Sequence, residues 1–90
     1  MKFEWDENKN ISNYKKHGID FYLATEVFSD ASAVEASRLV NGEERVQVIG
    51  KIEDVILSVA YSIRNNNIRI ISARVASKKE RQTYGQKNPT

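Results

Sequence analysis

The spacing of apolar residues changes near Ala33, from helical spacing before it to alternation after it. Alternation at every second position is the pattern of half-buried strands. Residues that favour turns interrupt this pattern and divide it into four expected strands. The strands are Ala33–Arg38, Arg45–Ile52, Val55–Ile63 and Ile68–Val75, and the turns are Asn41-Gly42, Glu53-Asp54 and Asn65-Asn66-Asn67. Because such short turns join antiparallel neighbours, we expect an antiparallel sheet.

The segment before Ala33 predicts a short strand and two helices. The strand covers Lys2–Trp5, and Asp6 follows it as the N-cap of a helix over Glu7–His17. Ile11 and Tyr14 are three residues apart and would form the buried stripe of that helix. A second helix is capped by Asp20 and ends near Ser29-Asp30. Its apolar stripe is Phe21, Ala24, Val27 and Phe28.

The end of the chain predicts a third, basic helix. Ser77-Lys78-Lys79-Glu80 has the form of a capping box, and the helix should reach Tyr84 before Gly85. The element order is therefore β-α-α-β-β-β-β-α. We expect an α+β fold in which an antiparallel sheet packs against the two N-terminal helices. Residues 1–85 would form a single domain and residues 86–90 a flexible C-terminal tail.

Composition and charge exclude several classes of function. The chain has no Cys, which excludes disulfides, thiolate nucleophiles and Cys-based metal sites. No apolar run approaches the ~20 residues of a membrane span, so we expect a cytoplasmic protein with no membrane partner. Residues 61–90 carry seven Lys and Arg against one acid, a net charge of +6, although the whole chain is only +2. This asymmetry favours a polyanion such as RNA as the ligand.

Alternation along the strands suggests where a groove could form. In Val55–Ile63 the small residues Ser58, Ala60 and Ser62 share a face with Ile56 and Arg64, and could form its floor. Strict alternation in the last strand puts Ile68, Ile70, Ser72 and Arg74 on one face. Arg64 and Arg69 would lie near the turn, and Arg74 at the opposite end.

The residue types would permit RNA cleavage without a metal ion or other cofactor. Such cleavage requires a base for the 2′-hydroxyl, cations around the phosphate and a proton for the leaving oxygen. Arg64, Arg74 and Arg81 could contact the phosphate, and Glu80 or His17 could be the base or acid. Glu80 is better explained as the capping-box acceptor than as a general base, and His17 as a cation at a helix C-terminus.

Other candidates are aromatic or basic. Tyr84 is a candidate for stacking on a base, and Trp5 and Tyr14 are expected in the core. One His and scattered acids make no ligand cluster, so no metal site is expected.

A series of motifs resembles the BrnT-type toxins of bacterial type II toxin–antitoxin pairs. The matching blocks are Phe3-Glu4-Trp5-Asp6, Lys9, Lys16-His17-Gly18-Ile19-Asp20-Phe21, Ala24, Val27-Phe28, Asp30, Gly42-Glu43-Glu44-Arg45, Ile49-Gly50, Val59–Arg64, Arg69–Arg74, Ala76, Glu80-Arg81 and Tyr84. The resemblance implies a RelE-like domain over residues 1–85. It also implies a metal-independent RNA endonuclease, giving cyclic phosphate ends, that inhibits translation and growth.

The resemblance also implies partners and site residues. The antitoxin would be a DNA-binding protein of the ribbon-helix-helix type, in a two-plus-two complex, and operator DNA would be bound only through it. The catalytic candidates are Arg64, Arg74, Glu80, Arg81 and, second, His17. The RNA-binding candidates are Lys16, which the resemblance implies, and Lys78, Lys79 and Tyr84, which are chosen because they lie on the basic third helix.

Two alternatives remain open from the residues alone. A non-catalytic nucleic-acid-binding module would need the same cations without a base. An interaction domain could use the basic helix only to dock an acidic partner, such as an antitoxin. Growth arrest on expression without a partner distinguishes the toxin from both.

Overall fold

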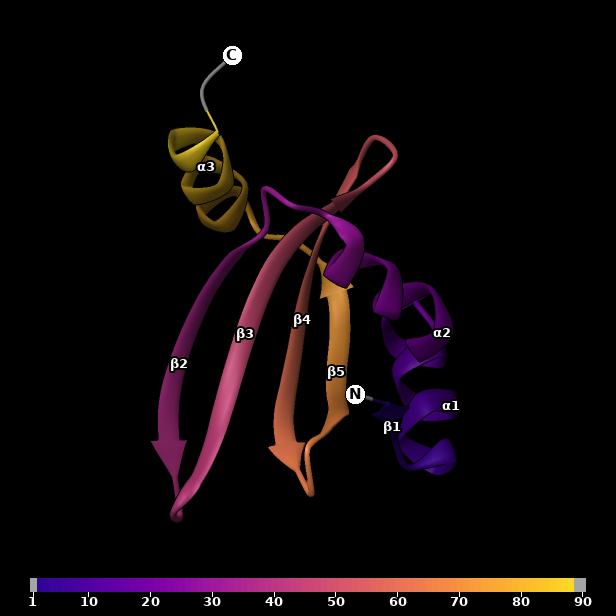
Figure 1. The fold of residues 1–90 in the computed structure, drawn as a ribbon. Helices are drawn as coiled ribbons and strands as arrows, with labels where there is room; N and C mark the ends of the chain where they lie inside the picture. The colour runs from indigo at the N-terminus through magenta and orange to yellow at the C-terminus, as the bar shows by residue number, and fades with distance from the viewer. Residues whose placement is uncertain (1, 89–90) are drawn as a thin grey trace.

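A single sheet of five strands, in the order β1-β5-β4-β3-β2, forms the centre of the molecule. The computed structural model describes residues 2–88, and Figure 1 shows α1 and α2 beside β1 and β5, with α3 near one end of the sheet. The elements are β1 (Phe3–Glu4), α1 (Glu7–His17), α2 (Phe21–Ala24), the 3-10 helix η1 (Thr25–Ser29), β2 (Val34–Val40), β3 (Glu43–Ile52), β4 (Val55–Arg64), β5 (Asn67–Val75) and α3 (Lys78–Lys87). The predicted α+β order is confirmed.

The sheet is mixed, so the expectation of a purely antiparallel sheet was wrong. Strands β2 to β5 pair antiparallel with their neighbours, as the turns require. Strand β1 pairs parallel with β5, through Phe3 opposite Ile68 and Glu4 opposite Arg69. No tight turn joins β1 to β5, because the helices α1, α2 and η1 and the strands β2 to β4 lie between them in the chain. Their relative direction was therefore not fixed by a hairpin.

Helix α1 has the predicted bounds but buries a different face. Asp6 accepts hydrogen bonds from two backbone N–H groups of the first turn, and Gly18 ends the helix with a φ of +74°. Ile11 and Tyr14 are 48% and 57% exposed, so the predicted apolar stripe is wrong. The buried residues are Asn10 and Asn13. They face the interior because their amides hydrogen-bond to backbone groups of Ile19 and Phe21, which follow the helix, and of β5.

The core lies between the sheet and the segment that contains α2 and η1. The predicted stripe is confirmed, since Phe21, Ala24 and Val27 are fully buried. The α-helix, however, ends at Ala24 and continues as the 3-10 helix η1. Gly50 of β3 permits the close approach of this turn, because a Cβ there would lie 3.0 Å from the Cβ of Val27. Trp5 packs against the core as predicted, with its ring edge-on to Phe21.

A β-bulge in β5 changes which side chains face the core. Tyr61 of β4 pairs with Ile70, but the preceding Ala60 pairs with Ser72, so Ile71 is an extra residue. The predicted strict alternation is therefore wrong beyond Ile70. Ile70 is buried in the core, whereas Ser72 and, two residues later, Arg74 lie on the opposite face. We call this opposite face, which points away from α1 and α2, the open face.

Helix α3 begins as predicted and ends later. The Ser77 hydroxyl and the Glu80 carboxylate form the expected capping box. The helix continues through Gly85 to Lys87, so the predicted end before Gly85 was wrong. Asn88 closes the helix, since its side-chain amide donates to the carbonyls of Tyr84 and Ser32. The remaining tail positions, 89 and 90, lie outside the described residues.

Candidate functional site

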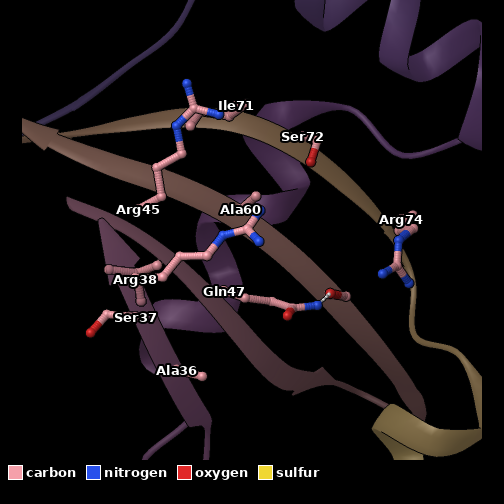
Figure 2. Close-up of a pocket in the computed structure, with 11 residues that line it drawn as sticks. Ala36, Ser37, Arg38, Arg45, Gln47, Ala60, Ile71, Ser72 and Arg74 are labelled. Carbon is pink, nitrogen blue, oxygen red and sulfur yellow. Dashed lines mark hydrogen bonds between the residues drawn. The ribbon is translucent and has the colours of Figure 1, made fainter. Parts of the chain in front are cut away.

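A pocket of about 450 Å³ lies on the open face of the sheet. Figure 2 shows the side chains of Arg38 and Arg45 extending across its floor, with Arg74 projecting from the opposite side. The lining residues come from β2 to β5. The polar ones are Ser37, Arg38, Arg45, Gln47, Ser58, Ser72 and Arg74. Three guanidinium groups thus face one cavity, which is an arrangement suited to an anionic ligand.

Strand pairing explains why these side chains meet. Arg45 and Gln47 are two residues apart on β3 and point to the same face. Gln47 lies opposite Ala60 on β4, and Ser58, two residues from Ala60, lies opposite Arg74 on β5. Ala60 has a small side chain, which leaves room above the middle of the sheet. The bulge in β5 is what brings Arg74 to this face.

The wall of the pocket contains a hydrogen-bonded cluster around Glu80. Arg74 donates two hydrogen bonds to the Glu80 carboxylate, at 2.7 and 2.9 Å. The Gln47 amide and the Ser58 hydroxyl donate to Glu80 Oε2, and the Ser77 backbone N–H donates to Oε1. The cluster therefore connects α3 with β3, β4 and β5, and it fixes the orientation of Arg74.

The cluster keeps Glu80 ionised over the whole physiological range. The hydrogen bonds from Arg74 lower the pKa of Glu80 to about 2, and the Ser77 N–H contributes in the same direction. The same pair raises the pKa of Arg74. A carboxylate with so low a pKa is a weak proton acceptor at neutral pH. Its geometry instead suits it to hold a cation in place.

Of the predicted catalytic residues, the structure brings Arg74 and Glu80 together and leaves the other three apart. Arg64 bonds to Glu43 at 3.3 Å, six residues along β4 from the position opposite Arg74. Six strand residues span roughly 20 Å. Arg81 donates to the Ala76 carbonyl and does not line the pocket. His17 ends α1, and α1 packs against the other side of the sheet.

The predicted RNA-binding residues also lie outside the pocket lining. Lys16 is exposed on α1, and Lys78 and Lys79 are exposed on the first turn of α3. The Tyr84 hydroxyl donates to Asp30 at 2.8 Å. Burial, and with it the Asp30 hydrogen bond, raises the pKa of that hydroxyl. Tyr84 is thus engaged in holding α3 against the loop before β2.

Sequence reasoning missed Arg38, Arg45 and Gln47. Arg38 and Arg45 lie in register on either side of the Asn41-Gly42 turn. Counting outward from that turn would have paired them, and this signal was present in the sequence. The role of Gln47 had no such signal, because its contact with Glu80 joins positions 33 residues apart.

Two further observations bear on the class of site. Within residues 2–88 there is no group of three or more His, Cys, Asp or Glu side chains that could hold a metal ion. No helix in the described part of the chain is long and apolar enough to cross a membrane.

A comparison with known protein families bears on the function of the chain. Residues 5–80 match the family model described as ribonuclease toxin, BrnT, of type II toxin-antitoxin system. The match covers most of the chain and includes every residue that we have placed in the pocket and in the Glu80 cluster. No curated protein matches the chain.

Proposed function

Because the chain belongs to the BrnT family of ribonuclease toxins of type II toxin–antitoxin systems, we propose that it cleaves RNA in the open-face pocket without a metal ion. The 2′-hydroxyl loses its proton to water as it attacks the adjacent phosphorus, the bond to the 5′-oxygen breaks and that oxygen takes a proton from water. The products are a 2′,3′-cyclic phosphate and a 5′-hydroxyl. The pocket with its three arginines is the observation that carries the proposal. We further propose a RelE-like fold, and inhibition of translation and growth in the cytoplasm.

Arg74 is the residue best placed to stabilise the reacting phosphate. Negative charge accumulates on the non-bridging oxygens as the 2′-oxygen attacks, and a fixed cation in a partly enclosed site stabilises that charge. Arg74 is fixed by two hydrogen bonds to Glu80, and it is 40% exposed on the pocket side. Its guanidinium therefore keeps donors available for a phosphate while its position stays constant.

Glu80 acts in this proposal as a positioning residue. Its pKa of about 2 makes proton abstraction from a 2′-hydroxyl unfavourable at neutral pH. Ser58 and Gln47 donate hydrogen bonds to the same carboxylate and so help to hold it against Arg74.

Membership of the family implies an antitoxin as partner. We expect a DNA-binding antitoxin of the ribbon-helix-helix type, which covers the arginines of the pocket and alone contacts operator DNA. The assembly expected is two toxins with two antitoxins. Light scattering on the co-expressed pair after size-exclusion chromatography measures this, and a mass of one toxin with one antitoxin would contradict it.

The function is tested by incubating purified protein with end-labelled single-stranded RNA in EDTA and analysing the new ends. Cyclic phosphate and 5′-hydroxyl ends are expected. Arg74→Gln should reduce the cleavage rate by about 10²-fold, which is the usual effect of removing one donor to a developing oxyanion. Lys9→Gln removes the same charge from α1 and should not change the rate.

A non-catalytic nucleic-acid-binding module is the second candidate. It is favoured by one observation, that the residues lining the pocket include no His, Asp, Glu, Lys or Tyr side chain that could serve as a general base. Tight RNA binding by the wild type, with intact RNA after incubation in EDTA and in Mg²⁺, would support this alternative over the nuclease.

A further inference from the structure

We infer that Arg38 and Arg45 form a second anion-binding subsite, which holds a different phosphate of the RNA strand from the one at Arg74. This inference rests on the proposed function and extends it. It assigns the β2–β3 hairpin to substrate binding and gives the pocket a footprint of at least two phosphates on one strand.

The first support is the direct pairing of two like charges. Arg38 of β2 and Arg45 of β3 are cross-strand partners in the antiparallel register. Side chains in such positions have Cβ atoms about 5 Å apart, and like charges there destabilise the sheet. Both residues line the same pocket, so both guanidinium groups lie on the open face. A phosphate between them would turn this repulsion into attraction.

The second support is the small number of partners that these two arginines have. Among residues 2–88, Arg38 forms no salt bridge. The Nε of Arg45 is buried without a hydrogen-bond partner, and a carboxylate oxygen of Glu43 lies 3.9 Å from it. Arg74, by comparison, donates two hydrogen bonds to Glu80. The rest of the Arg45 side chain is accessible, since the side chain is 42% exposed and lines the pocket, so its terminal N–H groups can reach a ligand oxygen.

The third support is the position of the pair relative to Arg74. Arg45 lies opposite Ser62 on β4, whereas Arg74 lies opposite Ser58. The backbone positions of Arg45 and Arg74 are therefore four residues apart along the strand direction, which is roughly 13 Å. Across the sheet they are two strands apart. Figure 2 accordingly shows Arg38 and Arg45 on one side of the pocket and Arg74 on the other. A single extended strand with successive phosphates matches two separated cation sites better than one small anion does.

Binding of a 2′-O-methyl RNA decamer, which cannot be cleaved through a 2′-hydroxyl, tests the subsite by fluorescence anisotropy. Arg38→Gln and Arg45→Gln should each weaken binding about tenfold, the usual effect of losing one charge-assisted contact. Each should lower the slope of log Kd against log salt by about 0.7, as loss of one phosphate contact on a single strand does. Lys9→Gln, with the same charge change on α1, should alter neither quantity.

Two further readouts separate binding from folding and from chemistry. Without RNA and at low salt, Arg38→Gln should raise the Tm by about 2 °C because it removes the repulsion, and ~1 M salt should abolish the gain. With cleavable RNA, Arg38→Gln should raise KM while kcat stays within about twofold. Arg74→Gln should instead lower kcat.

Arg38 is an exposed residue of an edge strand, so its variant tests the subsite even where Arg45→Gln fails to fold. Wild-type affinity and salt slope in Arg38→Gln would overturn the subsite and leave the nuclease standing, provided that the wild type cleaves RNA. A wild type that neither binds the decamer nor cleaves RNA overturns the proposed function and the subsite with it.

Discussion

At the scale of single residues, Glu80 connects the capping of α3 with the geometry of the pocket. The same carboxylate accepts a hydrogen bond from the Ser77 N–H, which caps the helix. It also accepts hydrogen bonds from Arg74, which lines the pocket. These two roles are compatible because the two carboxylate oxygens have several acceptor positions. The cap would be retained by a glutamine at this position, whereas the charge would be lost.

We therefore expect Glu80→Gln to change how stability depends on pH. The pKa of Glu80 is about 2 in the folded protein, below its usual 4.5. Its contribution to the free energy of unfolding is complete above pH ~4.5 and is lost as the pH falls toward 2. This contribution is on the order of 2 kcal/mol, reduced because Arg74 is partly exposed. Urea unfolding at pH 7, 5 and 3 measures it as the difference between wild type and variant, and a constant difference would contradict it.

Asn13 gives a second prediction at the same scale. Its side chain donates to the carbonyls of Ile19 and Ala73 and accepts from the Ala73 N–H, all in a buried environment. Asn13→Ala would leave these backbone groups unsatisfied and should lower the free energy of unfolding by about 2–4 kcal/mol. Denaturant unfolding is the measurement. Asn8→Ala, an exposed position of the same helix, should cost less than ~1 kcal/mol, and an equal loss in both variants would refute the argument.

At the scale of elements, α3 differs from the other helices because none of its residues is buried. It is held by polar contacts at both ends: the Glu80 cluster at its start, and the bonds of Tyr84 to Asp30 and of Asn88 to Ser32 near its end. A helix attached in this way opens at a lower free energy than the strands of the core.

Tyr84→Phe should therefore loosen α3 selectively. The substitution removes the hydrogen bond to Asp30 and keeps the ring. The free energy of opening α3 should fall by about 1 kcal/mol, which makes the exchange of its amide hydrogens roughly fivefold faster. Hydrogen exchange should show this acceleration in the amides of α3 and leave the amides of β3 and β4 unchanged. Tyr22→Phe serves as the control because Tyr22 is 65% exposed on α2. Uniform acceleration across the chain would mean that the helix is part of the global unfolding unit.

At the scale of the whole molecule, one face of the sheet carries the core, and the open face is the one that we propose as functional. Expression of the chain without an antitoxin should arrest growth, and Arg74→Gln should relieve the arrest while the far-UV circular dichroism spectrum stays unchanged. Colony counts after induction measure this. Full toxicity in Arg74→Gln would show that the pocket is not where the chain acts in the cell.

Local signals in the sequence determined the elements and their order. The N-cap at Asp6, the left-handed Gly18 and the capping box at Ser77 depend on neighbouring residues, so they could be predicted and were confirmed. The two-residue turns fixed the hairpins, and the resemblance to the BrnT family was confirmed over residues 5–80. Charge asymmetry indicated an anionic ligand, which remains a proposal.

Only the tertiary structure decided which side chains share the pocket. The extra residue Ile71 reverses the facing of β5 after Ile70, and no local pattern marks a bulge of this kind. The burial of Asn13 depends on a hydrogen bond to Ala73, 60 residues away. The bulge at Ile71 turns Arg74 toward the pocket, and the hydrogen bond between Asn13 and Ala73 holds the neighbouring part of β5 in place. Side-chain facing in a strand is set by partners distant in the chain, and this is the physical reason that the elements could be predicted while the site could not.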